Sequence, residues 1–203
     1  MPFRKSLISA FILLCAVPAL LAPAALAQNA LKNDDIAVSG LYEMTQTVSG
    51  NGITVKASKS SGGQAAFRHS FHYWMGYEAA YSYTRYTDVY TGQPFGIQHN
   101  QHEFSASYLV HGPTILVQPF ALAGISALIF SPSLNGGQNV TWQARPGINF
   151  AGGVNVPLLT SHIGLRIQYR GVYYKAPDYN RTVLKTNATR LTSEPMAGLY
   201  LKF

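Results

Sequence analysis

Cysteine is almost absent from this sequence. The single cysteine, Cys15, lies within an apolar stretch near the N-terminus, and none follows it. Residues 28–203 therefore cannot form a disulfide or a cysteine-ligated metal site. Disulfides commonly support proteins exported to an oxidising compartment, so this chain must gain its stability in another way.

The longest hydrophobic run lies at the N-terminus and has the features of a cleaved leader. Arg4 and Lys5 give a basic start, residues 7–21 are almost wholly apolar, and Ala25-Leu26-Ala27 is the small-x-small pattern that signal peptidases accept. We expect a signal peptide at residues 1–27 and one domain at residues 28–203. The alternative is an uncleaved membrane anchor, since the run is nearly long enough to span a bilayer.

The rest of the chain lacks a good transmembrane helix. Residues 114–130 come closest, but polar residues, a proline and a glycine interrupt them, and convincing amphipathic helices are absent as well. If the chain enters a membrane after its leader, it must do so with another kind of element.

Acidic residues are scarce. The chain has 8 of them against 15 lysines and arginines, a formal net charge of +7 that falls to +5 when Arg4 and Lys5 are removed. A basic excess can indicate nucleic-acid binding, but these cations are scattered, and we expect no nucleic-acid partner. Contact with outer-membrane lipid and the phosphates of lipopolysaccharide fits an exported protein better.

Alternation with period two is abundant and predicts β-strands. Between residues 163 and 174, Leu165, Ile167 and Tyr169 alternate with Arg166 and small or polar residues. One face is apolar or aromatic; the other is rich in glycine, alanine and serine, which suit a narrow lumen. Eight such runs occur, at roughly 36–47, 63–68, 75–87, 102–110, 115–130, 147–156, 162–175 and 195–203.

The connections between the runs alternate strictly between long and short. VSGNGITVKASKSSG and APDYNRTVLKTNATRLTSE are long, whereas HSFHYW, HGPT and PLLTS are short. Outer-membrane barrels have short turns on one side and long loops on the other. In lipid each unpaired backbone group costs several kcal/mol, so the sheet must close on itself. We predict an all-β fold, a closed eight-stranded antiparallel up-and-down transmembrane β-barrel.

Several segments carry a resemblance to a known family. GLYLKF at 198–203, GLRIQYRGVYYKAPDY at 164–179, GGQAAF and VQPFALAG resemble strands of the small eight-stranded outer-membrane barrels of the OmpA and opacity-protein type. The resemblance implies a Gram-negative outer-membrane location and a terminal segment recognised by the barrel assembly machinery. That assembly role is carried over to Leu199, Leu201 and Phe203.

Charged residues in the middle of strands predict an ionic interior. An eight-stranded barrel is just wide enough for side chains to fill it, so a diffusion pore is not expected. Buried charges must pair, and we predict an arginine–glutamate network in the lumen; a proton or ion path is the functional alternative. The residues expected to form it are Glu43, Arg68, Glu78, Glu103, Arg166 and Arg170.

The six histidines show no spacing typical of a metal site, and we interpret them as surface residues, with no cofactor. His69 and Ser70 are the nearest approach to a nucleophile and base, but neighbours on a strand point in opposite directions. We therefore expect a non-enzymatic protein. The alternatives are an outer-membrane lipid-modifying enzyme of the lipid A deacylase or acyltransferase type, and a soluble periplasmic lipocalin-like ligand binder.

The long loops carry several cations. Lys56, Lys59, Arg181, Lys185 and Arg190 all fall in the connections predicted to lie outside the membrane. Loops on a rigid scaffold often carry function. We expect a structural or surface-interaction role, in adhesion or in contact with lipopolysaccharide.

Overall fold

A computed structural model describes residues 33–113, 116–134, 136–160 and 162–203. Residues 34–202 form one compact unit. The predicted leader, residues 1–27, lies outside the described residues, so its cleavage stays a prediction.

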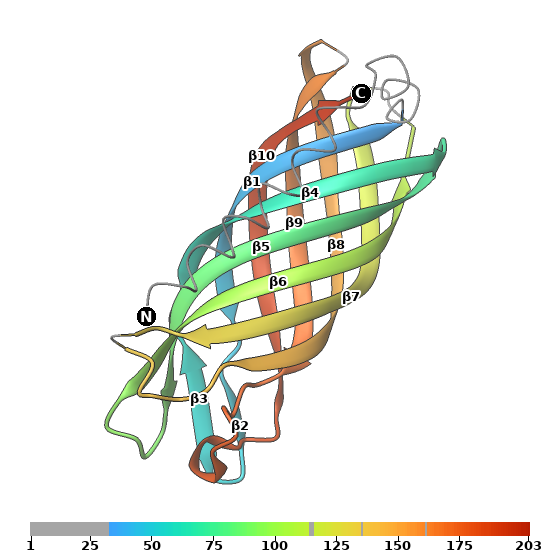
Figure 1. The fold of residues 1–203 in the computed structure, drawn as a ribbon. Helices are drawn as coiled ribbons and strands as arrows, with labels where there is room; N and C mark the ends of the chain where they lie inside the picture. Colours follow the sequence, from blue (N-terminus) through green and yellow to red (C-terminus); the bar gives the residue numbers. More distant parts are fainter. Residues whose placement is uncertain (1–32, 114–115, 135, 161) are drawn as a thin grey trace, which may run out of the picture. The chain divides into compact units, whose positions relative to one another are not determined.

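Eight long strands form a closed antiparallel barrel (Figure 1). Val38 in the first long strand pairs with Leu199 in the last, and β5 pairs with β6, so the sheet closes on itself. The predicted fold class is confirmed. The long strands are β1 (Asp34–Thr45), β4 (Ser60–His72), β5 (Met75–Tyr90), β6 (Gly96–His111), β7 (Gln118–Pro132), β8 (Gln143–Thr160), β9 (Ile163–Lys175) and β10 (Thr189–Lys202).

Helical structure is minimal in the described residues. It consists of one 3-10 turn, η1 (Thr182–Leu184), in the loop between β9 and β10. No described helix has the length and apolar character needed to cross a membrane.

The strands extend further than the sequence pattern predicted. The segment between 88 and 101 was expected to be a long loop, but β5 and β6 run through most of it and leave only residues 91–95 between them. Arg85, Gln98 and Asn100 cover the outer wall there, and Arg85 donates a hydrogen bond to Gln98 at 2.7 Å. The apolar alternation therefore ends where the outer wall turns polar, although the backbone pairing continues.

A small hairpin was also missed. β2 (Val48–Gly50) and β3 (Ile53–Ala57) pair with each other, and β3 continues along β5. Asn51 and Gly52 between them both have positive φ, 53° and 75°, as a type I′ turn requires. The Asn-Gly dipeptide was thus a sequence signal for this hairpin.

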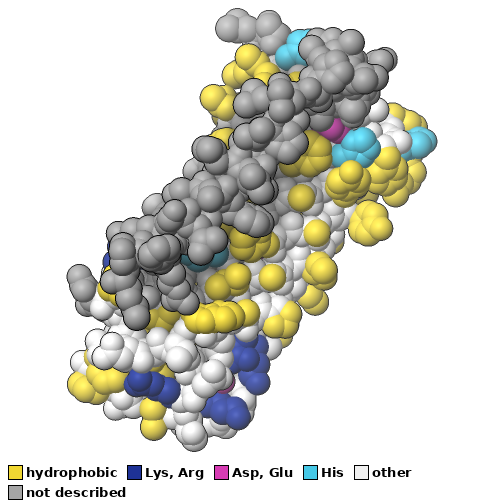
Figure 2. Space-filling model, viewed as in Figure 1, with side chains coloured by type: hydrophobic (Ala, Val, Ile, Leu, Met, Phe, Trp, Pro, Cys, Tyr) yellow, Lys and Arg dark blue, Asp and Glu magenta, His cyan; other side chains and the backbone are white. Residues whose placement is uncertain are grey.

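The two faces of the barrel wall differ as predicted. Leu165, Ile167 and Tyr169 lie on the outer wall, whereas Arg166, Gln168 and Arg170 are buried inside. Figure 2 shows apolar side chains along the visible wall. Exposed rings lie near both ends of the strands, among them Phe71, Tyr73 and Trp74 at the short turns and Trp142 beside the long loops.

The end of the barrel that carries the long loops, here called the outer end, is filled by a hydrophobic cluster. Tyr179 and Leu184 from the β9–β10 loop pack with side chains of the barrel wall and with Val55 of the hairpin. Gly50 of the hairpin lies so close to Thr186 that a Cβ at Gly50 would overlap the carbonyl of Thr186. The β9–β10 loop and the β2–β3 hairpin therefore form one packed plug with the wall.

Candidate functional site

The six residues expected in the lumen network are all buried in the barrel interior, at 1–3% exposure. Arg68 and Glu78, partners across β4 and β5, form an ion pair of 2.6 Å. Arg170 on β9 reaches across the lumen to Glu103 on β6 with two hydrogen bonds. Glu43 accepts a hydrogen bond from Thr45 at 3.1 Å. The charges are thus held in separate groups along the lumen instead of one continuous network.

Four further charged residues belong to the interior and were missed from the sequence. Asp35 pairs with Arg166 at 2.7 Å, Glu194 with Arg170 at 2.9 Å, and Asp88 with Arg190 at 2.9 Å. The prediction that Arg190 is a loop cation is wrong, because β10 begins at Thr189 and Arg190 faces inward. Tyr200 of β10 faces the interior, and every second residue before it does the same. Counting back by twos from Tyr200 reaches Glu194 and Arg190, so the sequence contained a signal for both.

A chain of hydrogen bonds runs along the inner wall from β9 to β4 at the end with the short turns. Arg166 Nε donates to Asn155 Oδ1 at 2.9 Å, and Asn155 Nδ2 donates to Gln118 Oε1 at 3.3 Å. Gln118 Nε2 lies 3.1 Å from His111 Nδ1, and His111 Nε2 lies 3.3 Å from the Ser70 hydroxyl. An arginine can only donate hydrogen bonds, so the Asn155 oxygen must accept from Arg166 and the Asn155 amide must donate to Gln118. The Gln118 amide must then donate to Nδ1 of His111.

This direction decides what the histidine offers to the serine. Nδ1 of His111 accepts from Gln118, so the ring hydrogen is on Nε2 and points at Ser70. A general base needs an unprotonated nitrogen facing the nucleophile. The predicted neighbour His69 instead bonds Asp34 through Nδ1 at 2.5 Å. The Ser70 hydroxyl therefore faces a hydrogen-bond donor on His111. The His111 ring is oriented by the side-chain amide of Gln118, where a catalytic triad would have a carboxylate.

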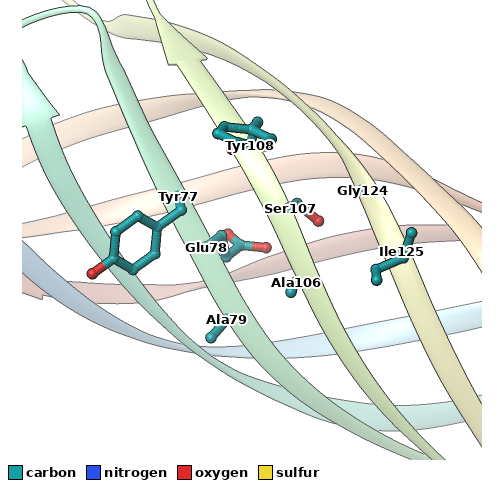
Figure 3. A pocket seen from close by; sticks show the side chains of 8 residues that line it. All are labelled: Tyr77, Glu78, Ala79, Ala106, Ser107, Tyr108, Gly124 and Ile125. Atoms are coloured by element: carbon teal, nitrogen blue, oxygen red, sulfur yellow. The ribbon is translucent and has the colours of Figure 1, made fainter.

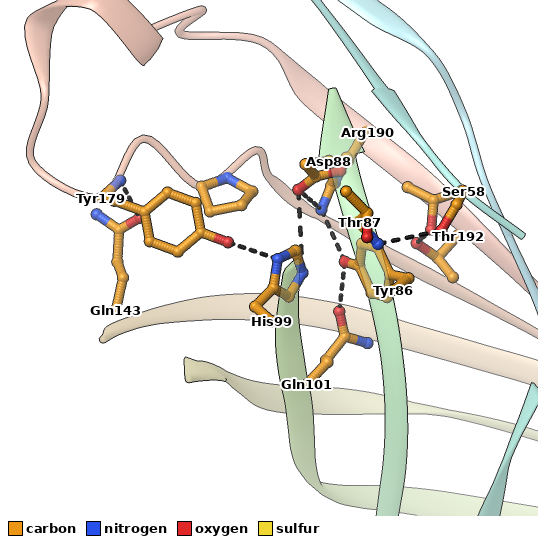
Figure 4. Close-up of polar contacts among 12 residues, drawn as sticks. Ser58, Tyr86, Thr87, Asp88, His99, Gln101, Gln143, Tyr179, Arg190 and Thr192 are labelled. Atoms are coloured by element: carbon orange, nitrogen blue, oxygen red, sulfur yellow. Dashed lines mark hydrogen bonds and ion pairs between the residues drawn. The ribbon is translucent and has the colours of Figure 1, made fainter. Parts of the chain in front are cut away.

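His99 is the buried histidine of the outer end, and its interpretation as a surface residue is wrong. Its ring is fully buried between Tyr179, whose hydroxyl lies 2.8 Å from Nδ1, and Asp88, whose carboxylate lies 3.9 Å from Nε2 (Figure 4). His99 lies in the part of β6 whose outer wall is polar. Burial lowers the pKa of His99 to about 4, against the opposing charge of Asp88.

No described cluster of three or more histidine, cysteine or acidic side chains has a geometry suited to a metal ion.

The outer end is distinguished by the distribution of its charges. All eight acidic residues of the chain are described, and each is buried or already partnered. Asp178, the acid nearest the loop surface, pairs with Arg145 at 2.9 Å.

Cations have the opposite distribution. Seven lysines and arginines of the described residues lie on the surface without an ion pair, and Lys202 alone of these lies at the end with the short turns. Several are visible as dark blue side chains at the outer end in Figure 2. The outer-end cations are Lys56, Lys59, Arg85, Lys175, Arg181 and Lys185.

Comparison with solved structures identifies the fold. Neisserial surface protein A superimposes with a TM-score of 0.60 and 18% identity, covering 84% of this chain and 97% of that one. OprG from Pseudomonas aeruginosa gives 0.60 and 14% identity, covering 84% and 96%. Ail from Yersinia pestis, in complex with the heparin analogue sucrose octasulfate, gives 0.51 and 12%, covering 84% and 99%.

This chain has the fold of the small eight-stranded outer-membrane barrels. The resemblance predicted from its sequence is therefore confirmed at the level of the fold. No protein-family model matches the sequence, and a comparison with curated proteins finds no match either.

The predicted assembly signal of this outer-membrane-type barrel occupies the end of β10. Leu199 and Leu201 lie on the outer wall, where they pair with Val38 and Ile36 of β1. Phe203 follows Lys202, the last residue of the strand, and its side chain is exposed. Recognition of these residues by assembly machinery stays a prediction.

The outer wall of the barrel also carries an apolar depression of about 420 Å³ over β5, β6 and β7 (Figure 3). Tyr77, Tyr108 and Ile125 stand around a floor that includes Ala79 and Ala106. The depression forms because small alanines face outward where neighbouring positions carry large side chains. In a bilayer this surface would contact hydrocarbon.

Proposed function

We propose that this protein is exported, inserts into the outer membrane, and uses its cationic outer end to contact anionic saccharide polymers at the cell surface, such as lipopolysaccharide. The observation that carries the proposal is the separation of charge. Every acid is buried or paired, while six unpaired cations gather at the outer end. A surface of one sign attracts polymers of the other sign over about a Debye length.

The fold supports the membrane location. An apolar and aromatic outer wall encloses an interior of paired charges, with exposed rings near both strand ends. Aromatic girdles at the two interfaces are typical of outer-membrane barrels. The cationic end is also the end with long loops, which in such barrels faces outside the cell.

A structural neighbour supports the choice of ligand. Ail, which shares this fold, was solved with the heparin analogue sucrose octasulfate. A densely sulfated saccharide suits a surface on which every charge without an ion-pair partner is a cation. The partner in the native membrane would be the phosphate-bearing saccharide of lipopolysaccharide.

We further propose that the role is non-catalytic. The support is the Ser70–His111 contact, in which the imidazole presents a hydrogen instead of a lone pair to the hydroxyl. Mass spectrometry of lipid A from cells with and without the protein tests this, and a change in acyl chains would contradict it.

Binding of the purified protein to immobilised lipopolysaccharide and heparin tests the main proposal. We expect retention that weakens steeply as salt rises from 50 to 300 mM, about the range over which screening acts. A variant with Lys56, Lys59, Arg181 and Lys185 changed to glutamine should lose most of this retention while keeping its folded gel mobility. Equal retention of both proteins would contradict the proposal.

A further inference from the structure

The β9–β10 loop contains a polar cavity of about 260 Å³ at the outer end. Asp178, Asn180, Arg181, Thr182 and Lys185 line it. We propose that this cavity is a discrete binding site for a phosphate or sulfate ester carried by a sugar. The inference rests on the proposed function and narrows it from a diffuse cationic surface to one site.

The loop that forms the cavity is held in place from below. The side chain of Tyr179 is buried and hydrogen-bonds His99, and Leu184 is buried in the plug. Gln143 Oε1 accepts hydrogen bonds from the backbone N–H groups of Asp178 and Tyr179, at 2.9 and 3.0 Å. A site on a fixed backbone loses little conformational entropy when it binds its ligand.

Asp178 does not make the cavity repel anions, because its charge is already compensated. Its Oδ1 accepts from Gln143 at 2.7 Å and from the Asn180 N–H at 3.1 Å, and pairs with Arg145 at 2.9 Å. Partial burial raises the pKa of Asp178, but these hydrogen bonds and the charge of Arg145 outweigh it and lower the pKa overall. Arg181 and Lys185 therefore leave the cavity with a net positive charge.

The donors of the cavity match a tetrahedral oxyanion. Arg181 is oriented by its Nη2, which donates to the carbonyls of Gln138 and Asn139 at 3.3 Å. Its Nε and Nη1 hydrogens, the Lys185 ammonium and the Thr182 hydroxyl have no partner among the described residues. A guanidinium, an ammonium and a hydroxyl together can satisfy three oxygens of a phosphate or sulfate.

The size of the cavity leaves room for a group larger than the anion alone. A volume of 260 Å³ is about nine times the share of one water molecule in the liquid, which exceeds what a single oxyanion fills. A sugar ring beside the ester would occupy the remainder, and its hydroxyls could bond Asn180.

NMR of the ¹⁵N-labelled full-length protein in nanodiscs tests the site. One arm uses glucose 1-phosphate and the other glucose 6-sulfate, which separates the phosphate of bacterial lipopolysaccharide from sulfated saccharides. We expect saturable shifts of the amides at residues 180–185 in at least one arm. Arg181→Gln with Lys185→Gln should weaken binding about tenfold or more, the loss of charge-assisted hydrogen bonds.

Lys56→Gln with Lys59→Gln is the matched control, since it removes the same charge from the same end of the barrel but not from the cavity. Thr182→Val removes one hydroxyl with little change of shape and should also weaken binding. The site is overturned if the wild-type protein shows no saturable shifts, or if the two double variants weaken binding equally. The two double variants could also lose heparin retention equally while the wild-type protein shows no saturable sugar binding. That result would overturn the discrete site but leave the proposed function, a diffuse cationic surface, intact.

Discussion

Arg190 and Asp88 form a bidentate ion pair inside the barrel. Arg190 Nη1 lies 2.9 Å from Asp88 Oδ1 and Nη2 lies 3.3 Å from Oδ2, and neither side chain is exposed. The pair joins β10 to β5 across the interior, and Arg190 also donates to the hydroxyls of Tyr86 and Tyr174. It therefore braces the barrel directly below the plug.

Removing one member of this pair should leave the other charge buried and unpaired. We expect Arg190→Met to lower the free energy of unfolding by about 3–5 kcal/mol. Urea unfolding of the refolded barrel, followed by gel mobility, measures it. The double variant Arg190→Met with Asp88→Asn should lose less than the sum of the two single variants. Strict additivity would show that the pair is not coupled.

Gly124, which faces the lumen from β7, should not tolerate an added methyl group. A Cβ at Gly124 would overlap the carbonyl of Ala106 and the backbone of Ser107. We expect Gly124→Ala to destabilise the barrel by about 1–3 kcal/mol, as for other overpacked interiors. Gly152→Ala on the neighbouring strand is the control, since its nearest atom lies 4.0 Å away. Equal stability of the two variants would contradict the close approach at Gly124.

His99 should make the plug sensitive to acid. Its pKa falls from 6.5 to about 4 in the folded protein. In the unfolded or opened state His99 therefore binds a proton below pH 6.5, whereas in the closed state it does so only below about pH 4. The contribution of neutral His99 to the stability of the closed plug is complete above pH 6.5. It is lost as the pH falls from 6.5 to about 4, by up to about 3 kcal/mol in the free energy of opening.

Hydrogen exchange of the Tyr179 and Leu184 amides at pH 7.5 and 4.5, corrected for intrinsic rates, measures this opening. We expect a smaller opening free energy at the lower pH in the wild-type protein. His99→Gln keeps an acceptor for the Tyr179 hydroxyl but does not titrate, so its opening should depend less on pH. The same pH dependence in both proteins would assign the effect to another group.

The end of the chain should govern assembly. We expect deletion of Phe203 to reduce the amount of folded barrel in the membrane fraction, because the terminal aromatic with Leu199 and Leu201 is predicted to be the assembly signal. Heat-modifiable gel mobility measures the folded fraction. Phe203→Tyr, which keeps an aromatic ring at the end of the chain, serves as the control, and unchanged barrel levels without Phe203 would contradict the prediction.

The sequence predicted the barrel because the wall obeys one local rule. Side chains such as Leu165 and Arg166 alternate between hydrocarbon and lumen, and period two is readable from residue types alone. The rule fails where the strand leaves the apolar band. There His99 and Arg190 were placed in loops, although the backbone pairing continues and their side chains face inward.

The plug was beyond the reach of local patterns. Tyr179 and His99 are 80 residues apart, and Gly50 meets Thr186 only because the hairpin and the last loop fold over the same opening. Such contacts depend on how the loops pack, which no short-range periodicity encodes. The polar cavity depends on the same packing, so the loop cations were recognised but not their arrangement.

The central claim is that hydrocarbon contacts the apolar wall while charges fill the interior. Spin labels placed one at a time at residues 163–170, in a background without Cys15, test it in lipid bilayers. Oxygen accessibility should peak at 163, 165, 167 and 169 and fall at 164, 166, 168 and 170. High oxygen accessibility at 166 and 168, or no alternation, would contradict the account.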